Sequence, residues 1–487
     1  MTTNTSASPS DSAARDWTCP FCSLLCDGLT LAPAAGDTAA PAGWQLGGSD
    51  CPRALAALRH FAPSASAAAA ASALIDGTPA AIDAAIAAAA DRLSHWRLPL
   101  FGGLATDVAG ARALYRLMNR SGGVADHASG DAISAGLRAL QDRGVFYTTL
   151  AEIKAHADLI VCLGTQPADH YPEFFRRCGA TEPGAFVQSR EIVYVALPAA
   201  TGATTGDHAA APDDGRLAAA AGLSIAPGAD LHATVATLAA LCAGRRLARP
   251  VDPALAALAD RLRAAHYAVL VWEPGSVARH ASLVAEGILQ CVSTLNAKSR
   301  AAAFALGGSD GAYTVQQAFT WMSGLPLRTA LHDGQLDHDP IRHASARLLA
   351  DNAVDGVLWV SSFGPTPALP GPAPVVIDTR ATEPPDPVAP LPAIVLGHPA
   401  QAAALGGRAD CIFIPVATPG IGAAGHLFRT EGSVLIPLAA VTDDGLPSVA
   451  EVVARIAAAM PPRASTAAGI DGATQSAASS TITGAAA

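Results

Sequence analysis

The chain has 487 residues and a formal net charge of −10 at pH 7, with 51% hydrophobic and only 15% charged residues. This acidic balance leaves too few basic residues for a patch that would bind nucleic acid or an anionic membrane surface, so we exclude both partners. The sequence shows no secretory signal and no run of about 18 large apolar residues that would predict a membrane span. We therefore expect a cytoplasmic protein whose cysteines stay reduced.

The two ends of the chain are small and polar. Residues 1–15 and 463–487 are rich in Ser, Thr, Gly and Ala and contain almost no large apolar side chains. Such segments cannot bury enough surface to fold, so both are predicted to be disordered tails. Between them we expect a small cysteine-rich domain at 16–61 and a larger region at 62–462.

The segment 16–61 contains four of the nine cysteines, at Cys19, Cys22, Cys26 and Cys51. Three thiolates within eight residues and a distant fourth suit a [4Fe-4S] cluster, in which each sulfur binds a different iron. Two alternatives stay open. Zinc is one, although tetrahedral sites more often use two separated CxxC pairs. A set of cysteines that holds no metal is the other.

The other five cysteines lie in apolar segments that indicate strands or helices, or stand alone. A buried free thiol behaves there as a small hydrophobic residue, so we predict structural roles for all of them. They are Cys162, Cys178, Cys242, Cys291 and Cys411.

From residue 79 onward, amphipathic helices alternate with short apolar strands. A helix is predicted over 79–96, a buried strand over 98–104 and a second helix over 105–122. The sequence of strand, small-residue turn and helix recurs at 155–166, 266–276, 355–364 and 373–382. Val/Ile/Leu-rich strands separated by helices indicate parallel sheets that are buried on both faces.

The predicted fold class is therefore α/β, with several doubly wound lobes. Ligands of such folds lie beyond the carboxyl ends of the strands, so the loops after Leu163, Val271 and Val360 are the expected place for a cofactor or cavity. The small polar segment 201–228 is predicted to be a surface excursion. The proline-rich segment 381–392 is predicted to be a loop or linker.

Five stretches carry a resemblance to a known family. They are WTCPFCSLLCDGL, SDCPRALAAL, FGGLATDVAGARALYRLMNRSGGVADH, ALGGSDGAYTVQQAFTWMSGLP and FIPVATPGIGAAGHLFRTEGSVLIPL. In this order they resemble the molybdopterin and tungstopterin oxidoreductases, and most of all the family of formylmethanofuran dehydrogenase B subunits, over most of residues 16–440. The resemblance implies that the four N-terminal cysteines hold a [4Fe-4S] cluster beside a metal-pterin centre. It also implies that Arg53 lies between the two centres; an exposed arginine in the first turn of a helix is the alternative.

The chain departs from the catalytic members of the family in two ways. They ligate molybdenum or tungsten through a cysteine or selenocysteine shortly after the segment that matches GGVADH, but no cysteine occurs between Cys51 and Cys162. Asp131 or Ala132 stands in that place, and aspartate ligates molybdenum in some relatives. The chain also runs into a small polar segment soon after residue 460, so we do not expect the further C-terminal domain that single-chain catalytic relatives usually carry. Molybdopterin and tungstopterin are therefore expected to be absent.

These departures match the branch of the family found in bacterial formyltransferase/hydrolase complexes. The resemblance implies a non-redox structural B subunit of such a complex, in the tetrahydromethanopterin-linked oxidation of formaldehyde to formate. Its implied partners are an amidohydrolase-like A subunit, a C subunit and a formyltransferase D subunit. The alternatives are a catalytic formylmethanofuran dehydrogenase B subunit with a metal-pterin and a [4Fe-4S] cluster, and an isolated iron-sulfur electron carrier.

Three further motifs resemble ligand sites in part. GGSDG at 307–311 and GIGAAG at 420–425 fit a dinucleotide-binding loop poorly, so turn glycines are favoured. HDGQLDHDPIRH at 332–343 gathers histidines and aspartates, but Gly334 and Pro340 interrupt any helix that would align them around a metal. We predict a polar loop there.

Overall fold

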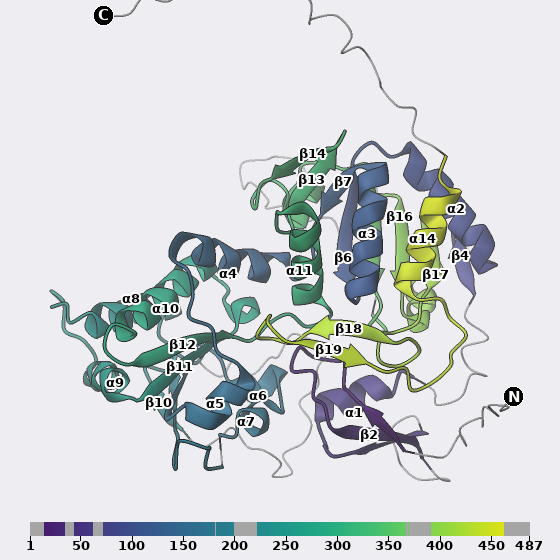
Figure 1. Ribbon diagram of the computed structural model, residues 1–487. Coiled ribbons are helices and arrows are strands. Elements are labelled where there is room, and N and C mark those ends of the chain that lie inside the picture. Colours follow the sequence, from purple (N-terminus) through teal and green to yellow (C-terminus); the bar gives the residue numbers. More distant parts are fainter. Residues whose placement is uncertain are drawn as a thin grey trace, which may run out of the picture.

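The computed structural model describes residues 14–34, 43–61, 72–180, 182–198, 222–366, 369 and 391–461. Within these ranges the chain builds two large sheets, each with helices on both faces, together with a small N-terminal sheet and a two-stranded hairpin (Figure 1). The predicted α/β class with several doubly wound lobes is confirmed. No helix in the described ranges combines the length and the apolar character that crossing a bilayer requires.

The N-terminal sheet is antiparallel and consists of β1 (Arg15–Trp17), β2 (Leu29–Pro33) and β3 (Trp44–Gly47), followed by α1 (Pro52–Leu58). Its two tryptophans are buried, and each indole N–H finds a carbonyl oxygen, as buried indoles require. The Trp44 N–H donates to the carbonyl of Phe61 at 2.8 Å, and the Trp17 N–H donates to Gly420 at 2.8 Å. The second bond ties this sheet to the C-terminal part of the chain.

The larger sheet has five parallel strands in its centre and an antiparallel hairpin at each edge. The central strands are continuous apolar runs because helices cover both faces. In sheet order the strands are β14 (Gln335–His338), β13 (Thr329–His332), β7 (Gly123–Ala125), β6 (Pro99–Ala105), β15 (Gly356–Ser361), β16 (Ala393–Gly397), β17 (Cys411–Pro415), β4 (Ala73–Ile75) and β5 (Thr78–Ala80).

Four long helices cover one face of this sheet, and two short helices cover the other. The first face holds α2 (Ile82–His95), α3 (Val108–Ser121), α11 (Ala312–Ser323) and α14 (Val449–Ala459) (Figure 1). The second holds α12 (Ser345–Ala350) and α13 (Ala402–Leu405). Each fully buried Leu, Ile or Phe in these two layers stabilises the fold by about 1.5–3 kcal/mol through burial.

The second large sheet is entirely parallel, with β8 (Leu159–Leu163) in its centre. Its other strands are β9 (Glu191–Val195) and β10 (Leu223–Ile225) on one side and β11 (Tyr267–Trp272) and β12 (Arg300–Ala305) on the other. One face packs against α4 (Gly130–Arg143), α8 (Leu231–Cys242), α9 (Pro253–Ala264) and α10 (Ala281–Leu295). The strand order reverses direction between β8 and β11, which is where doubly wound sheets place ligands.

The other face of the parallel sheet meets the cysteine-rich segment. It carries α5 (Leu150–His156), α6 (Pro167–His170) and α7 (Phe174–Arg177), and its core is continuous with the four N-terminal cysteines. The remaining elements are the hairpin of β18 (Gly425–Phe428) and β19 (Leu435–Leu438) and two short 3-10 helices, Pro274–Ser276 and Pro399–Gln401.

The elements predicted from the sequence compare well with those observed. The helices predicted over 79–96 and 105–122 are α2 and α3, and the strand predicted over 98–104 is β6. The strands predicted within 155–166, 266–276 and 355–364 are β8, β11 and β15.

Several predictions fall wholly or partly on residues outside the described ranges. The strand at 373–382 and the tail at 463–487 lie there entirely, as do all but two residues of the proline-rich segment. Most of 201–228 lies there as well, although its last part forms β10. Of the tail predicted over 1–15, Arg15 begins β1 and donates to the carbonyl of Val441 at 2.7 Å.

Candidate functional site

The structure brings the four N-terminal cysteines into one buried core. Cys19, Cys22 and Cys26 lie on the loop between β1 and β2, and Cys51 is the residue directly before α1. The loop closes on itself, because the Cys19 N–H donates to the carbonyl of Cys26 at 3.0 Å and the Leu25 N–H donates to Cys22 at 3.1 Å. Leu25 completes the turn in the left-handed region, with a φ of 41°.

Burial raises the pKa of all four thiols, to about 12 for Cys26 and about 11 for Cys51. The cysteines also act on one another, because the negative charge of a neighbouring thiolate raises the pKa of Cys19, Cys26 and Cys51 further. Thiolates at these positions therefore need a positive charge close by, and a bound metal supplies it.

Arg53 is a cationic side chain beside this set. It is half-buried, and its guanidinium donates to the carbonyl of Phe21 at 2.8 Å and to that of His170 at 3.0 Å. Its charge opposes the rise that burial causes in the pKa of Cys22. Arg53 therefore joins the cysteine loop to the end of α6 and is not a free surface arginine.

Two residues near Cys51 were not anticipated from the sequence. The Ser49 hydroxyl accepts the Cys51 N–H at 3.0 Å and donates to the buried carboxylate of Glu173 at 2.9 Å. Glu173 is also paired with Arg176. The position of Ser49, two residues before Cys51, could have indicated its contact with Cys51. Glu173 lies more than a hundred residues away along the chain, so no local pattern could have indicated its contact with Ser49.

The donor set fits a [4Fe-4S] cluster in kind and in number, because such clusters are held by four cysteine thiolates. Across the described ranges, no group of three or more His, Cys, Asp or Glu side chains is arranged to hold a metal ion. A cubane differs from a single ion, because it takes one thiolate at each of its four irons. The assignment of Cys19, Cys22, Cys26 and Cys51 as metal ligands stays a prediction.

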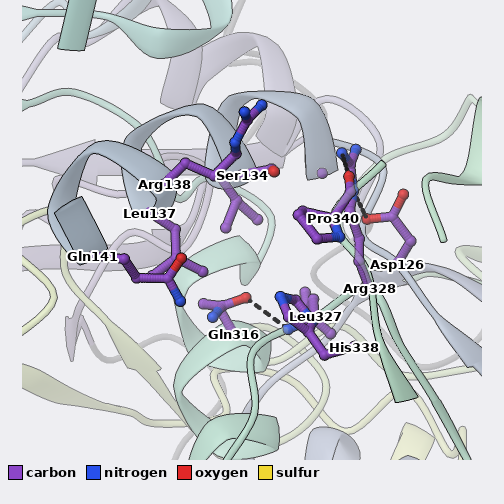
Figure 2. Close-up of a pocket in the computed structure, with 12 residues that line it drawn as sticks. Asp126, Ser134, Leu137, Arg138, Gln141, Gln316, Leu327, Arg328, His338 and Pro340 are labelled. Carbon is purple, nitrogen blue, oxygen red and sulfur yellow. Dashed lines mark hydrogen bonds and ion pairs between the residues drawn. The ribbon is translucent and has the colours of Figure 1, made fainter. Parts of the chain in front are cut away.

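A second polar cluster surrounds Arg328, near the position where catalytic relatives are expected to ligate their metal. Figure 2 shows the Arg328 side chain extending toward Asp126, with Pro340 and His338 beside it. Arg328 donates to Asp126 at 3.2 Å, to Asp131 at 2.5 Å and to the carbonyl of Pro340 at 2.7 Å. All three acceptors are satisfied by one guanidinium.

The two carboxylates of this cluster differ in exposure. Asp126 is 2% exposed and accepts two further hydrogen bonds from the backbone and hydroxyl of Ser345, at 2.8 and 2.9 Å. The Asp131 side chain is 89% exposed and has Arg328 as its ion-pair partner. Asp131, the residue expected near the metal position, therefore faces solvent at the start of α4.

The cavity beside this cluster is very small. It has a volume of about 10 Å³ and is lined by residues from α4, α11 and the β13–β14 region, among them Leu137, Gln316 and Leu327 (Figure 2). A cavity of this size holds no more than about one water molecule. A metal-pterin does not fit it, and an arginine without lone pairs is no ligand for a metal.

The segment 332–343, predicted to be a polar loop, is in part a hairpin, so that prediction is wrong for its first half. Strands β13 and β14 pair with His332 opposite Gln335, and Asp333 and Gly334 form the turn with φ of 48° and 77°. Asp-Gly is a preferred dipeptide for such two-residue hairpin turns. His338 accordingly bonds the hydroxyl of Thr329 at 3.1 Å.

The two glycine motifs act as turns at the described positions. In GGSDG, Gly308 and Gly311 have φ of 84° and 74°, and Gly311 is the N-cap of α11. In GIGAAG, Gly420 has a φ of 84°, and its N–H donates to Ala423 at 2.7 Å. Neither motif therefore changes the assignment of the site.

No protein-family model matches this chain. It is 29% identical over 361 residues to the B subunit of the formyltransferase/hydrolase complex Fhc of Methylorubrum extorquens, a match that covers 74% of this chain and 89% of the relative. In fold it is similar to a chain of the crystal structure of the formyltransferase/hydrolase complex FhcABCD of Methylorubrum extorquens in complex with methylofuran. The TM-score is 0.63 at 28% identity, over 79% of this chain and 98% of that one.

Proposed function

Because the chain resembles the B subunit of the formyltransferase/hydrolase complex in both sequence and fold, we propose that it is the non-redox structural B subunit of such a complex. The resemblance predicted from the sequence is confirmed, and it favours this function over that of a catalytic dehydrogenase. The partners are then a hydrolase A subunit, a C subunit and a formyltransferase D subunit. The complex works in the cytoplasm, in tetrahydromethanopterin-linked oxidation of formaldehyde to formate.

The observation that carries a non-redox role is the Arg328 cluster. Its guanidinium binds two carboxylates and a carbonyl, so the polar groups near the expected metal position already satisfy one another. Redox catalysis at a metal-pterin depends on the ligand that tunes the metal, and no thiolate is available there.

The four cysteines would hold a [4Fe-4S] cluster whose chemistry, when bound, is a one-electron redox couple and a covalent crosslink of its ligands. In a structural subunit the crosslink is the useful property. Cys19, Cys22 and Cys26 would be joined to Cys51 at the start of α1, against one face of the parallel sheet. Small segments of this kind often need such a staple, because their own core is small.

An exposed apolar face supports the subunit role. The Trp321 side chain on α11 is 63% exposed and packs edge-on against Phe428 of β18, with ring centroids 5.3 Å apart. Leu435 of β19 pairs with Phe428 and is 43% exposed, and Pro437 on the same face is also exposed. We call Trp321, Leu435 and Pro437 the hairpin patch.

Neither α11 nor β19 contains a charged residue, although the exposed His426 of β18 lies opposite Pro437 on the same face of the hairpin. The opposite face of the hairpin is already buried, because Leu427 and Leu438 pack into the interior. Cores of subunit interfaces are depleted of charge and enriched in tryptophan. The patch therefore suits a largely apolar surface on another subunit of the complex.

Co-purification tests the proposed function. The tagged chain is co-expressed with the A, C and D subunits of its own organism, and we expect all four in one complex. Metal analysis should find iron and no molybdenum or tungsten. A chain that purifies alone, or one that carries stoichiometric molybdenum or tungsten, would contradict the proposal.

A matched pair of variants tests the hairpin patch. Trp321→Ala should weaken assembly about 30-fold, the effect of losing a central aromatic contact worth about 2 kcal/mol. Phe186→Ala serves as the control, because Phe186 is 75% exposed but lies on the other lobe, stacked on His156. The measurement is subunit recovery across a concentration series. Equal recovery for the two variants would argue against docking at this patch.

A further inference from the structure

Two cysteines for which the sequence predicted separate structural roles are in contact in the core of the parallel-sheet lobe. Cys242 is the last residue of α8, and Cys291 lies in the third turn of α10. Their sulfur atoms are 3.3 Å apart, and both thiols are free and buried. Neither residue belongs to the N-terminal cysteine set or to the Arg328 cluster.

Close packing of the two helices produces this contact. A Cβ atom built on Gly287 of α10 would lie only 2.8 Å from a methyl group of Val235 on α8, so a glycine is needed at the crossing. Val235, Leu238 and Ile288 fill the rest of the interface as part of one apolar core. The sulfur atoms are therefore held together by helix packing, which restricts them in the folded protein.

The two thiols are not equivalent. Cys242 ends its helix and is followed by residues 243–250, all exposed, whereas Cys291 has helix on both sides. The S–H of Cys291 donates to Cys242 and lowers the pKa of Cys242, with the charge of Arg263 acting in the same direction. The same bond, together with burial, raises the pKa of Cys291.

We propose that Cys242 and Cys291 are a reversible redox pair, in which a hydroperoxide oxidises Cys242 and Cys291 then closes a disulfide between α8 and α10. Opening of the last turn of α8 admits the oxidant, because helix ends fray first. The pair would form its bond without a large rearrangement, since the sulfurs need to approach by only about 1 Å to reach a disulfide bond length. This inference does not depend on the proposed function.

The chemistry balances with hydrogen peroxide as the oxidant. The Cys242 thiolate attacks one peroxide oxygen, the O–O bond breaks, and the leaving hydroxide takes up a proton as water, which leaves a sulfenic acid. The Cys291 sulfur then attacks the Cys242 sulfur; its proton and the departing hydroxide form a second water. Two thiols lose two electrons in total, and one peroxide is reduced to two waters.

The first experiment measures the bond directly. The full-length chain, as purified, is treated with hydrogen peroxide, alkylated and digested, and peptides are identified by mass spectrometry. We expect one crosslinked peptide pair that joins Cys242 to Cys291 and lacks two hydrogen atoms, and that disappears after reduction. Peptides in which both residues remain alkylated, while thiols elsewhere are oxidised, would overturn the proposal.

The second experiment tests the order of the two steps and needs only the folded chain. In Cys291→Ser, a dimedone-type probe should trap a sulfenic acid on Cys242, whereas in Cys242→Ser the probe should leave Cys291 unlabelled. Cys411→Ser, a buried thiol of the other large sheet, should form the crosslink as the unaltered chain does. Labelling of Cys291 in the absence of Cys242 would overturn the assigned order. Circular dichroism verifies that each variant is folded.

Discussion

The N-terminal cysteine set and the Arg328 cluster are both buried polar groups, but they balance charge in opposite ways. The four thiols are buried together, which raises their pKa values, and Arg53 only partly opposes this at Cys22. In the Arg328 cluster, one guanidinium already satisfies two carboxylates and a carbonyl. The first group needs an added cation to ionise, whereas in the second each of these acceptors already has a hydrogen bond from the guanidinium, although burial still raises the pKa of Asp126.

This difference matters for the proposed structural role, because only the cysteine set needs a bound metal to balance its charge. A set of thiols becomes a strong crosslink when iron binds, because the ligands are deprotonated only in the presence of the metal. In the Arg328 cluster, by contrast, the buried carboxylate of Asp126 is already paired, and the adjoining cavity measures about 10 Å³. The two regions should therefore respond very differently to mutation.

The largest effect is expected for the cysteine set. Cys22→Ser should lower the iron content of the purified complex from about four per chain to near zero, because a cubane needs a thiolate at each iron. Iron analysis and visible absorbance measure this change. Cys411→Ser is the control, since that thiol is buried in β17 and should leave the iron content unchanged. Equal iron in both variants would mean that this set holds no cluster.

The next effect concerns the ion pair. Arg328→Ala should destabilise the fold by about 3–5 kcal/mol, because it leaves the buried charge of Asp126 without a cation. Asp131→Asn, at the exposed end of the same network, should cost less than about 1 kcal/mol. Urea unfolding of the two variants measures both values.

The same pair of variants separates a structural cluster from a metal site. If Asp131 were a molybdenum or tungsten ligand, Asp131→Asn would lower the content of that metal in the complex. We expect neither metal in the parent complex and no change in the variant. The backbone of Arg328 lies in the left-handed region, with a φ of 68°. Arg328→Ala would leave the backbone in this strained conformation but remove the side-chain hydrogen bonds that stabilise it.

The smallest expected effect concerns His170, whose carbonyl accepts a hydrogen bond from Arg53. His170 bonds the carboxylate of Glu273 at 2.9 Å, and that hydrogen bond raises the pKa of His170 against the opposing effect of burial. A raised histidine pKa stabilises the fold fully below the unfolded pKa of about 6.5, and the contribution is lost as pH rises through the folded pKa. The His170 side chain is 52% exposed, so we expect less than about 1 kcal/mol.

A comparison of pH profiles measures this contribution. The free energy of unfolding of the parent chain should fall relative to that of His170→Gln between about pH 6 and pH 8. His95→Gln is a suitable control, because the His95 side chain is 74% exposed and lies 3.9 Å from Asp91. A stability difference that grows with rising pH would contradict the expected direction.

Local sequence signals predicted much of the fold. The helices α2 and α3 follow from apolar periodicity, and β6, β8, β11 and β15 follow from short apolar runs that end in glycine or small polar residues. The β13–β14 hairpin was missed, because Gly334 suits an irregular loop as well as an Asp-Gly turn. Only the pairing of β13 with β14 distinguishes the hairpin from a loop, and this pairing is not visible in the sequence.

The candidate site divides in the same way. Cys19, Cys22 and Cys26 lie on one short loop, so their spacing alone indicates a common target. The partners of Arg328 could not be predicted, since Asp126 is 202 residues away along the chain. The contact of Cys242 with Cys291 depends likewise on how two helices cross, 49 residues apart.

The amino-acid sequence by itself determined the α/β class, the order of the main elements and the gathering of three thiols, because these properties depend on neighbours within a turn or a strand. Only the tertiary structure decided which charges meet. Asp126, Asp131 and Arg328 form one network because β13 pairs with β7 and α4 begins a few residues after β7, and long-range pairing of this kind leaves no local trace in the sequence. The N-terminal cysteine set could be recognised from the sequence, whereas the ion pair between Arg328 and Asp126 could not.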